Sequence, residues 1–262
     1  MSEVLAVERS ARGVVRLTLN RPDAHNALSP ELTEALEHAV DALGGDASLR
    51  ALVITGAGAS FCAGGDIKSM RAMVVGTRAE RMARSTRFAR LLAAIRALPV
   101  PVLARVNGPA YAGGAGLVSV ADIAIAADSA RFGFTEPRIG IAPANITPYV
   151  LARIGVTAAR RLFLTAQRFE AAEGLRLGLY DRVVAVDALE AAVDAELEAI
   201  LQCSPSALVA CKRLIAEVPG KDGEAAMAYT ATLLADLWET DDAREGIAAY
   251  NEKRKPRWAR ND

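Results

Sequence analysis

Two glycine-rich segments and one glutamate carry the residue types that could do chemistry in this chain. Residues 58–67 read Gly-Ala-Ser-Phe-Cys-Ala-Gly-Gly-Asp-Ile, residues 107–116 read Asn-Gly-Pro-Ala-Tyr-Ala-Gly-Gly-Ala-Gly, and Glu136 follows the second segment by 20 residues. Each segment is typical of a strand that turns tightly into a helix, and such a turn leaves backbone N–H groups without partners. Two such groups aimed at one oxygen would form an oxyanion hole, and a nearby carboxylate would transfer protons. This combination favours chemistry at the carbon next to a thioester carbonyl.

Strands and helices in alternation must position these segments. Apolar runs, alternation and capping residues predict strands at 4–8, 14–19, 51–55, 102–106 and 123–127, and helices at 30–43 and 79–97. The first two strands read as a hairpin. The later strands are separated by helices, so the pattern predicts an α/β fold built from crossover units.

The character of the chain changes near its end. Four helices are expected at residues 188–201, 204–217, 225–238 and 241–254, with no strand between them. We therefore divide the chain into a core at 1–187 and a helical C-terminal region at 188–262. The helical region is too thin to form a large core of its own, so we expect it to pack on a neighbour or a partner subunit.

The composition excludes several classes of function. Lys+Arg and Asp+Glu are both 31 in 262 residues, so no global charge favours nucleic acid or a membrane surface. No apolar stretch is long enough for a membrane span, and the N-terminal residues do not read as a signal peptide. The cysteines Cys62, Cys203 and Cys211 have no metal-ligand spacing. We expect a cytoplasmic protein without a metal site.

Motifs along nearly the whole chain resemble the enoyl-CoA hydratase/isomerase (crotonase) superfamily. The resemblance is carried by residues 19–28, 61–67, 107–116, 132–136 and 250–255, in the order that the family shows. It implies a spiral of β/β/α units with a helical C-terminal oligomerisation region that forms trimers or hexamers. It also implies an acyl-CoA thioester substrate and no metal or redox cofactor.

The resemblance assigns catalytic roles to three residues. Gly65 and Gly113 match the two oxyanion donors, which can each contribute roughly 3–4 kcal/mol in a dry site. Glu136 matches one of the two catalytic glutamates of the hydratases, and the other falls on Gly116, which has no side chain. The alternatives are glycines needed only for tight turns and a glutamate on the surface.

The resemblance also implies a set of substrate-binding residues. Asp66 is first a helix N-cap and second a site residue. Asn145 could hydrogen-bond a water or a polar acyl group, or cap a helix, and Gly116 would leave room for a substituent on C3. The full expected set is Ala27, Ala63, Asp66, Ile67, Gly116, Asn145, Tyr250 and Lys253.

A single glutamate leaves several functions open. One acid is enough to move a proton between two carbons, which favours a double-bond isomerase, whereas hydration needs a proton donor and an activated water together. The run 143–150, Pro-Ala-Asn-Ile-Thr-Pro-Tyr-Val, instead resembles hydratases of branched acyl-CoAs such as 3-methylglutaconyl-CoA. We therefore favour an enoyl-CoA hydratase over an isomerase, an inactive CoA-thioester-binding protein or a thioester hydrolase.

Overall fold

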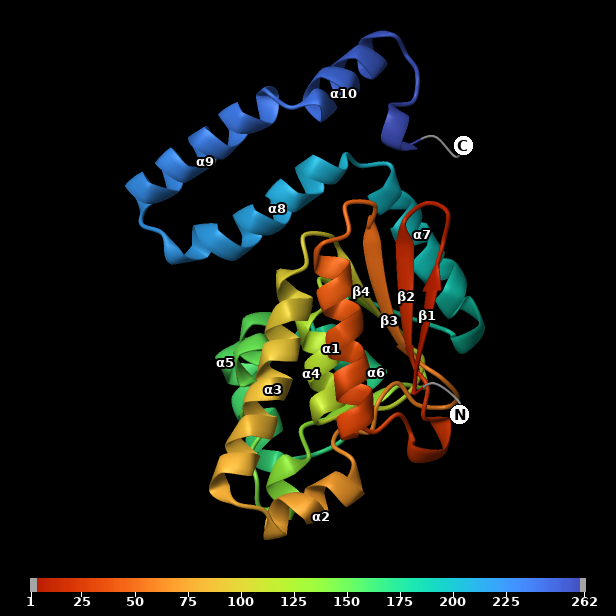
Figure 1. Cartoon of the computed structure of the whole chain (residues 1–262), viewed down its shortest axis with the longest axis vertical. Helices are drawn as coiled ribbons and strands as arrows, with labels where there is room; N and C mark the ends of the chain where they lie inside the picture. The colour runs from red at the N-terminus through yellow and green to blue at the C-terminus, as the bar shows by residue number, and fades with distance from the viewer. Residues whose placement is uncertain (1–3, 260–262) are drawn as a thin grey trace. The chain divides into compact units, whose positions relative to one another are not determined.

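The chain begins with the expected hairpin in this computed structural model, which describes residues 4–259. β1 (Leu5–Arg9) pairs antiparallel with β2 (Val14–Leu19), and Leu5 lies opposite Leu19 (Figure 1). Every second residue of β2 is buried, which is why the alternation in the sequence predicts this strand. Gly13 occupies the turn at a φ of 80°, where a side chain would be strained.

The hairpin forms one edge of a six-stranded sheet whose order is β1-β2-β3-β4-β6-β9. The remaining strands are β3 (Ala51–Gly56), β4 (Val102–Val106), β6 (Ile123–Ala127) and β9 (Arg182–Val184). From β2 to β9 all neighbouring strands are parallel. All six residues of β3 are buried, as expected for a strand covered on both faces. The α/β crossover architecture expected from the sequence is confirmed.

A second, smaller sheet was not expected from the sequence. Its order is β5-β7-β8, formed by Ala110–Tyr111, Arg131–Gly133 and Phe169–Glu170. β5 pairs parallel with β7, and β7 pairs antiparallel with β8. Strands of two or three residues have no measurable periodicity, so no pattern in the sequence predicts them.

The crossover helices pack on one another as well as on the sheet. They are α1 (Pro30–Gly44), α2 (Ile67–Val75), α3 (Arg78–Ala97), α4 (Gly113–Val120), α5 (Thr147–Thr165) and α6 (Ala171–Leu177). α1 contacts α3, α3 contacts α4, and α4 contacts α5 (Figure 1). Ser29 caps α1 by accepting a hydrogen bond from the Leu32 N–H, the cap that the sequence predicts.

The chain divides into two compact units. The first runs to Leu98 and continues over Val102–Val193, and the second comprises Pro99–Pro101 and the residues from Asp194 on. The C-terminal helices are α7 (Leu189–Leu201), α8 (Pro205–Glu217), α9 (Gly223–Trp238) and α10 (Asp241–Asn251). Within the described part of this tail no strand interrupts them, as expected, although α10 ends three residues before the predicted 254.

No single helix among residues 4–259 has both the length and the apolar character of a membrane span. One sharply bent pair, residues 186–201 with 205–220, meets those criteria only when the two helices are taken together.

Candidate active site

The first glycine turn is fixed by two buried or half-buried asparagines. The side chain of Asn26 is fully buried and donates to the carbonyls of Ala57 (2.9 Å) and Ser60 (2.7 Å). Asn107 accepts from the Gly56 N–H at 3.1 Å and donates to the Gly58 carbonyl at 2.9 Å. Amide side chains that bridge several backbone groups act as rigid braces. The two asparagine side chains therefore fix the backbone between the end of β3 and Gly65.

The two glycine segments are joined along a seam. Cys62 pairs with Ala110 in a parallel bridge, and the Tyr111 N–H donates to the Cys62 carbonyl at 2.9 Å. A Cβ added to Gly114 would lie 2.3 Å from the Cys62 carbonyl oxygen, so only glycine fits there. Gly64 has a φ of 93°, and a Cβ on it would lie 2.8 Å from that of Ala112. Because glycine has no side chain, Gly64 and Gly114 allow the backbones of the two turns to contact each other directly.

Both expected oxyanion donors follow this seam. Gly65 precedes Asp66, the N-cap of α2, and Gly113 is the first residue of α4 after Ala112, whose φ is 50°. Among residues 4–259, neither the Gly65 nor the Gly113 N–H has an acceptor. An N–H at the start of a helix also carries the positive end of the helix dipole. The structure thus offers two free donors on neighbouring turns.

Glu136 is tied to the second turn through the small sheet. β5 and β7 pair Tyr111 with Gly133, and the Ala112 N–H donates to the Gly133 carbonyl at 2.9 Å. Glu136 follows three residues later and opens the 3₁₀ helix Glu136–Ile139. This pairing brings the segment that carries the glutamate to the start of α4.

The Glu136 carboxyl is buried without a full set of partners. The side chain is 9% exposed, and its Oε2 atom has no hydrogen-bond partner. Burial raises the pKa of this carboxyl above its usual 4.5, and only the backbone of Glu136 itself opposes the shift. A buried carboxyl with a raised pKa is a candidate for proton transfer. The surface alternative for Glu136 is wrong.

The space expected beside Gly116 is occupied. A Cβ on Gly116 would lie 2.2 Å from Cγ2 of Ile146 and 3.0 Å from its Cβ. The Ile146 side chain is 2% exposed. The expectation that Gly116 leaves room for a C3 substituent is therefore wrong, because an isoleucine from the start of α5 fills that volume.

Asn145 is engaged with α3. Its Oδ1 accepts from the Ser85 hydroxyl at 2.9 Å, and its Nδ2 donates to the Ser85 carbonyl at 3.2 Å. The N-cap residue of α5 is Ile146, with no side-chain cap, so Asn145 does not cap that helix. Its polar role in substrate binding stays a prediction, and its role in the structure is to fasten the start of α5 to α3.

Four of the expected substrate-binding residues lie at or beside the first glycine turn. The Ala63 N–H donates to the His25 carbonyl at 2.9 Å. Ala27, two residues after His25, is buried. Asp66 accepts from the Ser69 N–H at 3.0 Å, which confirms the N-cap, and forms an ion pair with Arg21 at 3.0 Å. Ile67 is 68% exposed, on the first turn of α2.

The last two expected residues lie in the second unit. Tyr250 is 85% exposed near the end of α10, and Lys253 follows that helix with a φ of 54°. Their roles toward a substrate stay predictions.

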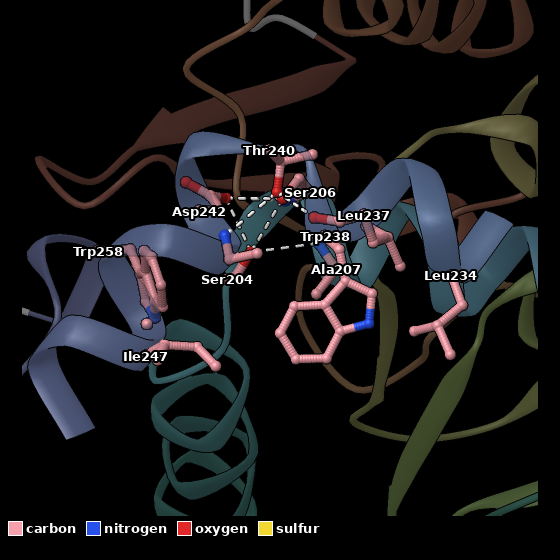
Figure 2. Close-up of a pocket in the computed structure, with 12 residues that line it drawn as sticks. Ser204, Ser206, Ala207, Leu234, Leu237, Trp238, Thr240, Asp242, Ile247 and Trp258 are labelled. Carbon is pink, nitrogen blue, oxygen red and sulfur yellow. Dashed lines mark hydrogen bonds between the residues drawn. The ribbon is translucent and has the colours of Figure 1, made fainter. Parts of the chain in front are cut away.

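A groove in the second unit is separate in chemistry from the glycine turns. It has a volume of about 310 Å³, and Figure 2 shows Leu234 and Trp238 facing it beside a cluster of hydrogen-bonded polar groups. In that cluster the Asp242 carboxylate accepts from the hydroxyls of Ser204 and Ser206, both at 2.8 Å. Because this carboxylate is already fully engaged, the groove offers apolar surface rather than a catalytic group.

Nucleophilic and metal chemistry find few candidates in the described structure. Burial raises the pKa of the Cys62 thiol to about 12, so it stays protonated, as expected of a small buried filler. Among residues 4–259 no group of three or more His, Cys, Asp or Glu side chains could hold a metal ion.

Sequence reasoning missed the groups that position the site rather than act in it. In the sequence, Asn26 and Arg21 stand out only as part of a motif, and Ile146 only as part of the 143–150 run. Asn26 stands in a short turn segment, and an asparagine in such a segment is a typical partner for neighbouring backbone groups; here it donates to the Ala57 and Ser60 carbonyls. No local signal marks Ile146, because its partner Gly116 lies 30 residues earlier.

Known proteins match this chain over nearly its whole length. A family model described as enoyl-CoA hydratase/isomerase matches residues 9–261. The Pseudomonas aeruginosa AtuE structure is 42% identical with a TM-score of 0.93, covering 98% of this chain and 100% of that one. A Mycobacterium smegmatis enoyl-CoA hydratase structure is 36% identical (TM-score 0.93; 98% and 99% covered), and one from Shewanella pealeana is 30% identical (0.93; 97% and 96%). This chain therefore belongs to the enoyl-CoA hydratase/isomerase family and has the crotonase fold.

Proposed function

We propose that this protein is an enoyl-CoA hydratase, which adds water across the 2,3 double bond of an acyl-CoA thioester. The observation that carries the proposal is the buried Glu136 carboxyl, whose Oε2 has no partner, close in the fold to two N–H groups without acceptors. Similarity to structures named as enoyl-CoA hydratases supports it. The thioester supplies the carbonyl that such a pair of donors would stabilise.

In the proposed mechanism the thioester oxygen accepts hydrogen bonds from the N–H groups of Gly65 and Gly113. This polarisation withdraws electrons from the double bond and makes C3 electrophilic. Glu136 takes a proton from a water molecule as the water oxygen bonds to C3, and the electron pair of the double bond moves to C2 and the thioester oxygen. The same carboxyl then returns the proton to C2. Each preorganised donor would contribute roughly 3–4 kcal/mol.

Double-bond isomerisation is the second candidate, and one observation favours it. Gly116 replaces the second acid, and Ile146 fills the space in which that acid would lie. A single carboxyl that removes a proton from one carbon and returns it to another is sufficient for isomerisation. Hydration with one acid requires that carboxyl to act twice within one turnover.

The acyl group of the substrate is a finer proposal. The 143–150 run supports a branched chain such as that of 3-methylglutaconyl-CoA. The volume beside Gly116 gives no support for a branched chain, because Ile146 fills it.

We assign no resident metal or redox cofactor to the reaction, since every step is performed by the thioester, Glu136 and two backbone groups.

We also propose that the helical unit mediates self-association into a trimer or hexamer. α9 is apolar in composition, yet none of its residues is buried, and Met227 and Trp238 are 68% and 60% exposed. Such a surface is typical of an interface. Light scattering on the purified protein tests this.

A cytoplasmic location is supported by the three free cysteines.

Ultraviolet absorbance of the conjugated enoyl thioester separates the candidate functions. We expect absorbance to fall when the protein is given crotonyl-CoA or 3-methylglutaconyl-CoA, because hydration removes the conjugated double bond. A rise with a 3-enoyl-CoA and no fall with the other two would establish the isomerase instead. Release of free thiol would indicate a hydrolase, and no reaction with any substrate an inactive binder.

A further inference from the structure

We infer that Ile146 is a specificity-determining residue that shapes the acyl end of the site, and that the Asn145–Ser85 pair is the device that positions it. The inference rests on the proposed acyl-CoA substrate. It assigns to one aliphatic side chain the volume that position 116 leaves unused.

The first step is the shared face of α4. Gly113 and Gly116 are three residues apart, so they lie on the same side of this helix. A Cβ on Gly113 would meet Leu28 Cδ1 at 2.9 Å and Phe88 Cζ at 3.4 Å, whereas a Cβ on Gly116 would meet Ile146. The helix face that presents the proposed donor therefore continues, about one turn further, onto Ile146.

The second step is the rigidity of Ile146. A β-branched side chain has few rotamers, and this one is 2% exposed and packed on a glycine. The Thr147 hydroxyl that follows donates to the Pro143 carbonyl at 2.7 Å. The Ile146 side chain is thus held by its packing against Gly116 and by the hydrogen bond between Thr147 and Pro143 in the turn that carries it.

The third step is the attachment to α3. Both polar atoms of the Asn145 side chain are hydrogen-bonded to Ser85, one to its hydroxyl and one to its carbonyl. Ser85 lies three residues before Phe88, so both project from one side of α3. One face of α3 thereby sets the wall at Gly113 and the position of the turn that carries Ile146.

The consequence is a site bounded by hydrocarbon at the point where a second acid is missing. Removing atoms from Ile146 would open volume beside Gly116, about one helical turn from the proposed donor Gly113. A methyl branch on C3 of the acyl chain would gain that volume, while an unbranched chain would gain little. Burial of one extra methyl contributes about fourfold in affinity.

The test measures binding of saturated acyl-CoAs, which needs no turnover. Calorimetry gives the Kd of 3-methylbutanoyl-CoA and of butanoyl-CoA for the full-length protein and its variants. We expect Ile146→Ala to shift the ratio of the two Kd values by about fourfold toward the branched ligand, and Ile146→Val to shift it less in the same direction. Ile154→Ala removes a buried isoleucine further along α5 and should leave the ratio unchanged.

The positioning pair has its own readout. Ser85→Ala removes the hydroxyl that donates to Asn145 and should shift the ratio of the two Kd values. Ser85→Thr keeps a hydroxyl, so its ratio of Kd values should equal that of the wild type. An unchanged ratio in both Ile146 variants would overturn the inference, as would an equal shift in Ile154→Ala. A shifted ratio in a protein that hydrates no enoyl-CoA would uphold the inference and reject the hydratase. Failure of the wild type to bind either ligand would reject both.

Discussion

Substituting Gly114 by alanine tests the idea that the two glycine turns act as one rigid unit. Gly114 has ordinary helical geometry in α4, so alanine is compatible with its backbone. The added Cβ would lie 2.3 Å from the Cys62 carbonyl oxygen, whereas ordinary contacts begin at 3.4 Å. The obstacle is backbone, so the two turns must separate by about 1 Å.

Two magnitudes follow from that displacement. Overpacking costs about 1–3 kcal/mol, partly offset by up to about 1 kcal/mol of helix propensity gained on replacing glycine. With the full offset we therefore expect a net loss of about 0–2 kcal/mol in the free energy of unfolding. Gly113 is adjacent, so its N–H shifts relative to that of Gly65. A misplacement of about 1 Å in a catalytic array costs on the order of 100-fold in rate.

The assay compares kcat/KM for crotonyl-CoA hydration with the free energy of unfolding from denaturant titration. Gly44→Ala is the matched control, since a Cβ there meets nothing within 4 Å at the end of α1. This control should keep wild-type activity and equal or slightly higher stability. If folded Gly114→Ala retained kcat/KM within threefold of wild type, the reasoning about a shared rigid seam would be refuted.

Three further predictions concern ionisable residues. Burial raises the pKa of Glu136, so the folded state holds this proton more tightly than the unfolded state. The free energy of unfolding should therefore fall as the pH rises from 4.5 through the raised pKa. Denaturant titrations at a series of pH values should show this fall in the wild type but not in Glu136→Gln. Burial alone would raise the pKa of Asp242, but hydrogen bonds from Arg257 and two serines lower it to about 2. Its stabilising contribution should be present above pH 3.8 and disappear as the pH falls toward 2, and Asp242→Asn should lack it at every pH. Asp66→Ala should cost about 1–2 kcal/mol through loss of the α2 cap and the Arg21 ion pair, while Asp66→Asn, which still caps, should lose less; thermal unfolding distinguishes them.

Much of the fold is predictable because its signals are local. β4 and β6 have the bounds that the sequence predicts, and β3 is one residue longer, since each is a buried apolar run of normal length. Helix α1 starts at the expected serine cap and proline. The strands of the small sheet were not predictable, because two or three residues carry no pattern.

The site divides in the same way. Glycine turns and an N-cap at Asp66 are visible in the sequence because they depend on neighbouring residues. The seam between Cys62 and Ala110, and the filling of position 116 by Ile146, depend on residues 30 or more positions apart. Distances of that kind appear only once the chain is folded, which is why the space at Gly116 was misjudged.

The central claim is that one buried carboxyl transfers the protons of the reaction. The most direct measurement compares wild type and Glu136→Gln in the absorbance assay with crotonyl-CoA, alongside calorimetric binding of butanoyl-CoA. Glutamine keeps the shape of the side chain but cannot take a proton, so we expect turnover to fall by at least about 100-fold while butanoyl-CoA binds with unchanged affinity. Near-normal turnover in the Glu136→Gln variant would contradict the account.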